Sequence, residues 1–234
     1  MAVSISARLA GLAGPLLGQD CLLCGDSAGD RLLCPECAAD LPRLPAEVCP
    51  RCAQPSPGGA VCGSCLRHPP AFDATRAAFR YGFPLDRLVQ LLKFNHRLAV
   101  APFLARAMLE GGVPAGDCLL PVPLSHRRLA ERGFNQAQEI ARCLARGSGL
   151  PLLSEACLRG LDTPPQSALP WKARRANIRR AFECRTDLTG RAVILVDDVM
   201  TSGATLDELA GVVRLHGAGP VVCWVAARAV RGED

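Results

Sequence analysis

Four C-x-x-C pairs near the start of the chain constrain its fold more than any other feature. The pairs are Cys21/Cys24, Cys34/Cys37, Cys49/Cys52 and Cys62/Cys65. The first two map onto the last two by one constant shift, because 21 becomes 49, 24 becomes 52, 34 becomes 62 and 37 becomes 65. A fixed offset of 28 residues across four positions indicates a duplicated unit.

Each repeat carries the ligands of one metal site. Two C-x-x-C knuckles place four thiolates at the corners of a tetrahedron, which is the arrangement of a structural zinc ion. Four protein ligands leave no position for water, so these sites are expected to be structural rather than catalytic. Iron in a rubredoxin-like site uses the same ligands and remains the alternative. We predict two structural Zn²⁺ sites, held by Cys21, Cys24, Cys34 and Cys37 and by Cys49, Cys52, Cys62 and Cys65.

The clustering of cysteines also bears on the cellular compartment. Thioredoxin-type C-x-x-C occurs once per domain after a strand, so four copies do not fit a redox enzyme. In a reducing compartment clustered cysteines bind metal more often than they pair.

No stretch approaches the roughly 18 uncharged apolar residues of a membrane-spanning helix. Residues 1–18 are interpreted as a short packing helix rather than a signal peptide, and we expect a cytoplasmic protein. Most of the five cysteines without a paired spacing are expected in the core: Cys118, Cys143, Cys157, Cys184 and Cys223.

After residue 70 the pattern changes to alternating strands and helices. We expect strands in 71–83, 117–122, 192–196 and 221–226, and helices over 84–92, 98–109, 136–144 and 205–216. The runs AVILV and VVCWVA are continuously apolar, which is typical of strands buried on both faces of a parallel sheet. The sequence therefore predicts an α/β protein with a Cys-rich zinc-ribbon-like domain over 1–69 and a parallel-sheet domain over 70–234.

The candidate chemistry is concentrated in VILVDDVMTSGAT, residues 193–205. Asp197 and Asp198 are expected at the carboxyl end of a buried strand, where ligands bind in such sheets. The small residues from Thr201 to Thr205 allow backbone N–H groups and a helix dipole to face a phosphate. The two carboxylates suit ribose hydroxyls or a hydrated Mg²⁺.

Two other classes combine an apolar strand with acidic residues. An ATPase needs G-x-x-x-x-G-K-[ST], and the only lysines, Lys93 and Lys172, stand in no such context. A phospho-acceptor receiver domain splits its acids between strands. A purely structural loop would bury two adjacent acids without compensation, which is costly. These comparisons favour a phosphate-containing ligand.

The sequence resembles the ComF family of the type I phosphoribosyltransferase superfamily, in which a zinc-binding segment precedes a phosphoribosyltransferase domain. The resemblance covers nearly the whole chain. It rests on the Cys repeat, PVPLSHRRLAERGFNQAQEIA (121–141), QSALPWKARRANIRRAF (166–182) and VILVDDVMTSGAT. The last of these resembles the motif that binds 5-phosphoribosyl 1-pyrophosphate (PRPP), and RGFNQ (132–136) narrows the resemblance to ComF.

The resemblance implies a type I phosphoribosyltransferase-like parallel sheet flanked by helices, with PRPP and Mg²⁺ as ligands. Residues 121–124 would lie at the pyrophosphate, and 166–182 would match a loop that closes over the site. The implied catalytic residues are Asp197, Asp198, Arg132 and Lys172. The implied PRPP-binding residues are Asp197, Asp198, Val199, Met200, Thr201, Ser202, Gly203, Ala204, Thr205, Asn135 and Arg175. No general base is identified, and His126 is a candidate by position alone.

The expected function is Mg²⁺-dependent phosphoribosyl transfer to an unknown acceptor. The alternative is an accessory protein of competence and DNA uptake that binds PRPP and single-stranded DNA, or competence-machinery proteins, without transferase turnover. The basic stretches 126–132 and 172–180 permit this alternative. A net charge of +5 suits a small anionic ligand better than extensive coating of DNA, and the few aromatic residues argue against a base-stacking platform. Lys93 and His68 are expected to be ordinary exposed residues.

Overall fold

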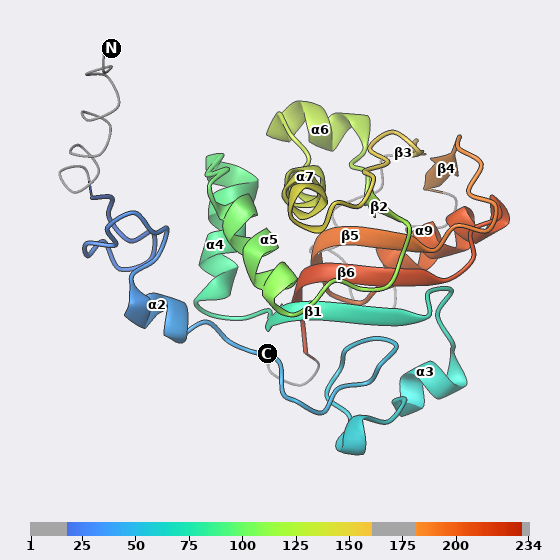
Figure 1. Cartoon of the computed structure of the whole chain (residues 1–234), viewed down its shortest axis with the longest axis horizontal. Helices are drawn as coiled ribbons and strands as arrows, with labels where there is room; N and C mark the ends of the chain where they lie inside the picture. Colours follow the sequence, from blue (N-terminus) through green and yellow to red (C-terminus); the bar gives the residue numbers. More distant parts are fainter. Residues whose placement is uncertain (1–17, 161–180, 231–234) are drawn as a thin grey trace, which may run out of the picture.

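The centre of the molecule is a four-stranded parallel sheet (Figure 1). A computed structural model describes residues 18–160 and 181–230. The strands are β1 (Ala74–Arg80), β2 (Cys118–Pro121), β5 (Val193–Met200) and β6 (Val221–Arg228). Their order is β1-β6-β5-β2, and every neighbouring pair is parallel. The parallel sheet expected from the continuous apolar runs is confirmed.

Helices cover both faces of this sheet, as a parallel sheet requires. The helices are α4 (Leu85–Asn95), α5 (Val100–Glu110), α6 (His126–Arg132), α7 (Gln136–Ser148) and α9 (Ala204–Leu215). Apolar residues of α4, α5 and α7 share one core cluster, and those of α9 belong to a second. Adjacent residues of β5 divide between the clusters, since Ile194 faces the first and Leu195 the second. The loop after β5, which carries the candidate residues Thr201 to Thr205 and is called the functional loop below, therefore joins two layers of the fold.

The helices of the first layer begin and end at residues suited to those positions. Ser125 caps α6 by accepting a hydrogen bond from the Arg128 amide, and Asn135 caps α7 by accepting one from Ala137. Gly133 and Gly149 end the same two helices in the left-handed conformation. The RGFNQ segment is thus the junction between two capped helices, which fixes Arg132 and Asn135 next to each other.

A two-stranded antiparallel ribbon stands beside the main sheet. It consists of β3 (Cys157–Arg159) and β4 (Phe182–Cys184), and the amide of Gly160 donates to the carbonyl of Ala181 at 3.0 Å. The ribbon brackets residues 161–180. The predicted site residues Lys172 and Arg175 fall in that interval and lie outside the described residues.

The Cys-rich segment contains short helices at its metal knuckles and covers the outer edge of β1. Its helical elements are α2 (Pro35–Ala39), η1 (Pro57–Gly59) and α3 (Gly63–Arg67). The Arg80 amide donates to the Pro42 carbonyl at 2.9 Å, and the Thr75 amide to Pro50 at 3.1 Å. Figure 1 shows α2 at one side of the molecule and α3 beneath β1. An otherwise open strand edge is thereby paired and protected.

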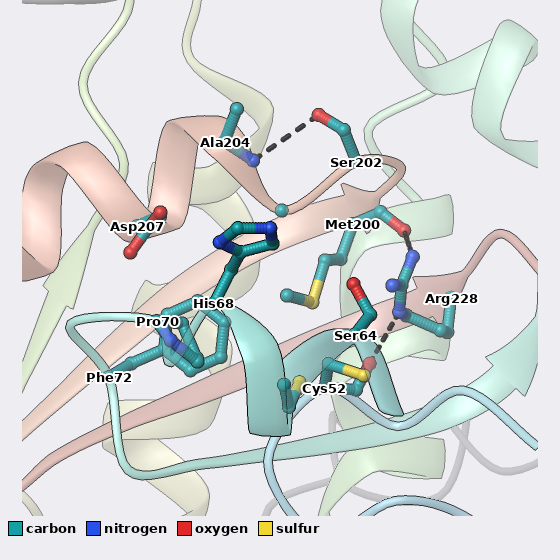
Figure 2. A pocket seen from close by; sticks show the side chains of 12 residues that line it. Cys52, Ser64, His68, Pro70, Phe72, Met200, Ser202, Ala204, Asp207 and Arg228 are labelled. Atoms are coloured by element: carbon teal, nitrogen blue, oxygen red, sulfur yellow. Dashed lines mark hydrogen bonds between the residues drawn. The ribbon is translucent and has the colours of Figure 1, made fainter. Parts of the chain in front are cut away.

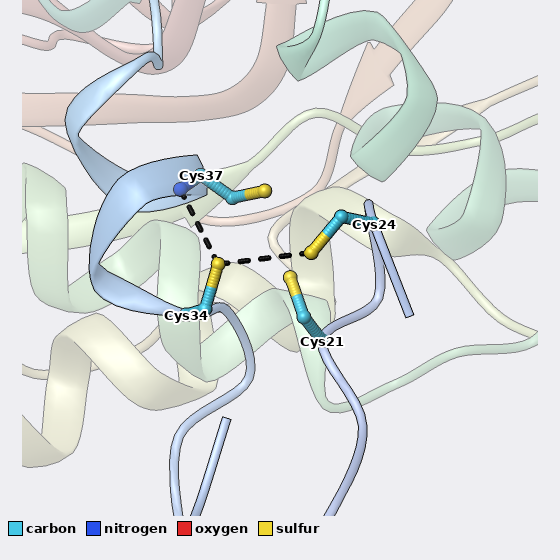
Figure 3. A group of neighbouring side chains, drawn as sticks. All are labelled: Cys21, Cys24, Cys34 and Cys37. Atoms are coloured by element: carbon cyan, nitrogen blue, oxygen red, sulfur yellow. Dashed lines mark hydrogen bonds between the residues drawn. The ribbon is translucent and has the colours of Figure 1, made fainter. Parts of the chain in front are cut away.

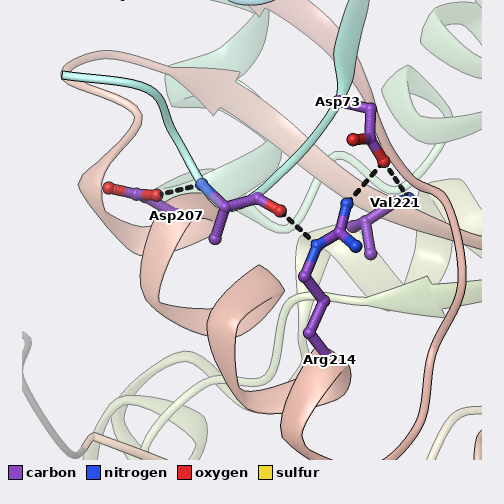
Figure 4. Close-up of polar contacts among 5 residues, drawn as sticks. Asp73, Asp207, Arg214 and Val221 are labelled. Carbon is purple, nitrogen blue, oxygen red and sulfur yellow. Dashed lines mark hydrogen bonds and ion pairs between the residues drawn. The ribbon is translucent and has the colours of Figure 1, made fainter. Parts of the chain in front are cut away.

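The segment that leads into β1 is tied to α9 (Figure 4). Asp207 accepts a hydrogen bond from the Ala71 amide at 2.7 Å, and Arg214 donates to the Ala71 carbonyl at 2.6 Å. Arg214 also pairs with Asp73 at 2.6 Å, and the same Asp73 oxygen accepts from the Val221 amide at 2.8 Å. The helix that follows the functional loop is therefore attached to the end of the Cys-rich segment.

Most predicted elements exist, but β5 is longer than predicted, and several elements were not predicted: α6, the β3–β4 ribbon and the short helices of the Cys-rich segment. The strand predicted over 192–196 extends to Met200, because Asp197, Val199 and Met200 remain paired with β6. Helix α6 was not predicted, since its sequence is too polar for a clear apolar period. Among the described residues, no helix combines the length and apolar character needed to cross a membrane.

Candidate functional site

Two groups of four cysteines are assembled as metal sites. Within each group the Sγ atoms all lie within 4.8 Å of one another. The groups are Cys21, Cys24, Cys34 and Cys37, and Cys49, Cys52, Cys62 and Cys65. Figure 3 shows the four side chains of the first group converging from two knuckles. The predicted assignment of one site to each repeat is confirmed.

The electrostatics of these clusters fit a cation. Burial raises the pKa of the Cys21 thiol, but backbone hydrogen bonds from Cys24, Cys34 and Leu23 outweigh it and lower that pKa to about 6. The pKa of Cys37 is raised instead, because its side chain adjoins Cys34. The Cys21 thiolate therefore forms readily, whereas the Cys37 thiol resists ionisation. A bound cation removes that resistance, and four thiolates with tetrahedral spacing suit Zn²⁺.

The second cluster behaves in the same way. Burial raises the pKa of Cys49, and backbone hydrogen bonds from Cys62, Cys52 and Arg51 outweigh it to lower the pKa to about 7. The amide of Cys62 lies 3.3 Å from the Cys49 sulfur. Such N–H···S bonds are outer contacts that orient the ligands of a metal.

A separate cavity of about 890 Å³ opens at the end of the sheet. The loop after β2 forms one wall with Val122, Pro123 and Leu124. The end of β5 contributes a second wall: Asp197, Asp198, Val199, Thr201 and Thr205. Helix α4 and the α6–α7 region contribute Val89, Gln90, Lys93, Phe94, His96, Arg128, Glu131, Arg132 and Gln136. Tyr81, after β1, and Arg159, on β3, complete the lining. The structure thus brings the predicted acids and Arg132 to one cavity.

The acids face the cavity because the strands of the sheet are staggered. β2 ends where Pro121 pairs with Val196. β5 continues past this point with β6 as its neighbour, so Asp197 and Asp198 lie beyond the end of β2 while still inside a strand. A strand holds its side chains more rigidly than a loop does. Because β5 extends to Met200, Asp197 and Asp198 lie within a strand and have fixed positions.

Lys93 is the cation that sequence reasoning missed. Its Nζ lies 2.5 Å from Oδ2 of Asp198, and the two side chains are 22% and 4% exposed. The expectation of an ordinary exposed lysine is wrong. A signal was present, because two buried acids demand a compensating charge and the sequence holds only two lysines.

The two neighbouring carboxyl groups have opposite pKa shifts. Burial would raise the pKa of Asp198, but the charge and hydrogen bond of Lys93 outweigh it and hold that pKa below its ordinary value. Burial and the charge of Asp198 raise the pKa of Asp197 well above its ordinary value. Oδ1 of Asp197 accepts a hydrogen bond from the Asp198 amide at 2.9 Å. The pair is thus asymmetric, with Asp198 ionised beside Lys93 and Asp197 favouring its proton.

The loop after β5 makes a glycine turn that opens helix α9. Gly203 is the residue before α9 and has a φ of 82°, where a Cβ would lie 2.8 Å from the Met200 side chain. The Ser202 hydroxyl accepts a hydrogen bond from the Ala204 amide at 3.2 Å. Thr201 and Thr205 line the large cavity. An N-terminus with this glycine turn presents amides and a positive dipole end to an anion.

The remaining predicted residues lie in two places, on the far side of the loop after β5 and at the junction of α6 and α7. Met200, Ser202, Gly203 and Ala204 line a smaller cavity of about 220 Å³ that faces the second cysteine cluster. Asn135 donates to the Val122 carbonyl at 3.0 Å besides capping α7, so it joins that helix to the loop after β2. Arg132 lies over the Phe94 ring, 5.5 Å from its centroid, and donates to Gln136 at 2.6 Å.

Comparisons with known proteins agree with the double cluster and the overall sequence pattern. Residues 13–66 match the double zinc ribbon domain. The DNA utilization protein YhgH of Salmonella typhi is 33% identical over 205 residues, covering 84% of this chain and 90% of its own. Competence protein F of Haemophilus influenzae is 34% identical over 179 residues, covering 72% and 78%. Competence protein ComFC of Bacillus subtilis is 29% identical over 188 residues, covering 76% and 75%.

Two solved structures show limited likeness in fold. A purine phosphoribosyltransferase from Pyrococcus horikoshii has a TM-score of 0.31 at 17% identity, covering 58% of this chain and 89% of that one. The allosteric regulatory enzyme of purine biosynthesis has a TM-score of 0.38 at 19% identity, covering 53% and 25%. The extended similarity to the competence proteins is the stronger finding, and the chain belongs to the ComF family.

Proposed function

We propose that the chain binds PRPP together with Mg²⁺ and transfers its phosphoribosyl group to an acceptor that the sequence does not identify. One observation carries this proposal. Asp197 and Asp198 line a cavity of about 890 Å³ near the end of β5, and the strand is followed by the glycine turn that opens α9. This arrangement offers acceptors for sugar hydroxyls next to donors for a phosphate.

The roles of the residues follow from their chemistry. Asp197 and Asp198 would accept hydrogen bonds from the ribose hydroxyls, and the Thr201–Thr205 turn would donate to the 5′-phosphate. Lys93 keeps Asp198 ionised for this purpose. Arg132 lines the same cavity and would bind the pyrophosphate, where negative charge grows as the C1′–O bond breaks. Mg²⁺ would supply further positive charge to that leaving group.

The test is calorimetry with PRPP in the presence and absence of Mg²⁺. Wild type is expected to bind PRPP with Mg²⁺, and the double variant Asp197→Asn/Asp198→Asn is expected to bind at least about tenfold more weakly, the usual cost of lost hydrogen bonds to charged groups. Glu183→Gln is the control, because Glu183 is an exposed acid on β4 that pairs with Arg185. Failure of wild type to bind PRPP would overturn the proposal. Release of pyrophosphate with a panel of acceptors then separates turnover from binding.

A second function is favoured by the rim of the cavity. Phe94 is 68% exposed and lies beneath Arg132, so an aromatic face and a cation stand together at the opening. Such pairs bind the bases and phosphates of single-stranded nucleic acid, and one group of relatives is named for DNA utilization. We propose single-stranded DNA as the second candidate ligand. Fluorescence anisotropy with an oligonucleotide should show a steep salt dependence and weaker binding of Phe94→Ala. Equal binding of Phe94→Ala and wild type would exclude this role for the rim.

The proposed location is the cytoplasm. Eight metal-binding thiols keep their ligand form in a reducing compartment, whereas an oxidising one would pair them. Fractionation of cells that express the tagged chain tests this placement directly.

A further inference from the structure

The second cysteine cluster is built into the sheet that carries the functional loop. Thr75 on β1 donates its hydroxyl to the Arg51 carbonyl at 2.6 Å and its amide to the Pro50 carbonyl at 3.1 Å. The Cys52 carbonyl accepts from Nε of Arg228 on β6 at 2.6 Å. The backbone of the Cys49–Cys52 knuckle is therefore held by two neighbouring strands.

Arg228 also holds the start of the functional loop. The residue is 1% exposed. Its Nη1 donates to the Met200 carbonyl at 2.8 Å and to the Ala229 carbonyl at 2.9 Å, and it makes a further short hydrogen bond to the Thr201 carbonyl. Figure 2 shows the guanidinium between Met200 and Cys52. One planar group thus connects a metal-ligating residue to the first residue of the phosphate turn.

A buried guanidinium makes this connection stiff. A charged group removed from water is stable only while its N–H groups meet acceptors. If the Cys52 carbonyl moves away, Arg228 loses an acceptor and must shift toward others. Its other partners include the Met200 and Thr201 carbonyls, so the loop shifts with it.

The position of Cys52 depends on metal. The buried core of the second cluster consists of Cys49, Cys52 and Cys65, with Val61 and Cys62 packed against them. So small a core cannot hold the knuckles together by apolar packing, and a zinc ion supplies the cross-link in modules of this kind. The hydrogen bonds from β1 and β6 hold one side of this knuckle, and a metal ion shared with Cys62 and Cys65 would hold the other, so metal binding contributes to where the Cys52 carbonyl lies.

Direct packing does not replace this connection. The smaller cavity of about 220 Å³ separates Ser202, Gly203 and Ala204 from Ser64 and His68 at α3. Figure 2 shows Ser202 and Ala204 on one side of this cavity and Ser64 and His68 on the other. The rear of the phosphate turn is thus open, and its position depends on Arg228 before the turn and on the Asp207–Ala71 hydrogen bond after it.

We propose that Arg228 is a positioning residue that couples metal occupancy of the second cysteine cluster to phosphate binding at Thr201–Thr205. The inference rests on the proposed function for the phosphate turn. Coupling between two sites is reciprocal. Zinc at the second cluster therefore tightens phosphate binding, and a bound phosphate ester tightens zinc binding by the same factor. We expect the tighter zinc binding to be seen as slower loss of that zinc.

The experiment measures this reciprocity in the full-length, zinc-loaded protein with ribose 5-phosphate as the probe. Zinc release to a coloured chelator is followed with and without saturating probe, and Cys62→Ser identifies the phase that belongs to the second cluster. In wild type the probe is expected to slow that phase about fivefold or more, the lower end of ordinary coupling. In Arg228→Lys the slowing is expected to disappear. The single ammonium of lysine lacks the planar, forked donors with which the guanidinium reaches the carbonyls of Cys52 and Met200 together.

A matched control and a check of folding complete the test. Arg76→Lys changes another sheet arginine that donates to a carbonyl, that of Gly111 at 3.3 Å, and should keep the slowing. Circular dichroism establishes that each variant is folded. Probe binding to wild type with unchanged zinc release would overturn the coupling while leaving the proposed function intact, and this comparison needs no variant. Absence of binding by ribose 5-phosphate and PRPP alike would overturn the proposed function and the coupling together.

Discussion

Lys93 on α4 and Asp198 on β5 form an ion pair of 2.5 Å at the base of the main cavity. The pair joins one helical layer to the strand that carries the acids. It also makes two adjacent carboxyl groups unequal, since Asp198 has the cation and Asp197 does not. Several expectations follow from that inequality.

Replacing Lys93 with methionine should destabilise the protein. Asp198 would keep its buried charge without a partner, which costs about 3 kcal/mol of unfolding free energy. Urea unfolding measures the loss. Arg87→Met is the control on the same helix, because Arg87 is exposed and its removal should change stability by less than about 0.5 kcal/mol. Equal midpoints for the two variants would mean that the ion pair contributes nothing.

The two acids should respond in opposite directions to the same substitution. Asp197→Asn should raise the unfolding free energy by about 1 kcal/mol, because it removes a carboxyl whose ionisation the fold disfavours. Asp198→Asn should lower the free energy, because it leaves Lys93 without its partner. Thermal unfolding at neutral pH distinguishes these outcomes. Destabilisation by both substitutions would show that Asp197 is not strained in the free protein.

The two carboxyl groups should also affect the pH dependence of stability in opposite directions. The pKa of Asp197 is raised on folding, so its carboxyl favours the folded state at acid pH and loses that contribution as pH rises through the folded pKa. The pKa of Asp198 is lowered, so its contribution is present above the ordinary aspartate pKa and is lost as pH falls through the folded pKa. Asp197→Asn should therefore remove a decline of stability above about pH 4. A pH series of urea midpoints for wild type and variant measures the difference.

Gly203 should tolerate no side chain. Alanine there meets a left-handed backbone and a Met200 side chain 2.8 Å from its Cβ, so we expect a loss of about 1–2 kcal/mol and about tenfold weaker phosphate binding. Gly211 lies inside α9 with open space around it. Gly211→Ala should therefore stabilise the helix by about 0.5–1 kcal/mol. Differential scanning calorimetry and ribose 5-phosphate titration test both, and similar results for the two glycines would contradict the special geometry of the turn.

Metal analysis should find two zinc ions per chain. Acid should release them, since protons compete with the metal for the cysteine thiolates. Elemental analysis after dialysis at graded pH measures the release. A red protein that contains iron would instead favour the rubredoxin-like alternative.

Sequence reasoning succeeded where the pattern is local. The duplicated cysteine spacing identified each metal site, and the apolar runs identified the parallel strands, because both depend on neighbours along the chain. The ion pair of Lys93 and the role of Arg228 depend on contacts between distant segments, so neither spacing nor composition indicated them. The boundary between 69 and 70 stays a prediction, as do the roles of Lys172 and Arg175.

The length of β5 shows a different limit. Polar residues after an apolar run ordinarily mark a strand end, and Asp197 suggested one. Pairing with β6 continues to Met200 regardless, because backbone hydrogen bonds do not depend on side-chain polarity. Sites often occur where local signals and tertiary structure disagree in this way.

The position of β6 between β1 and β5 has a consequence for how the chain is made. Asp73 and Val221 are bonded across 148 positions of sequence, so the sheet cannot close until its central strand has been synthesised. The cysteine clusters span short segments near the start and can take up metal long before that. Metal loading would thus precede sheet closure during synthesis.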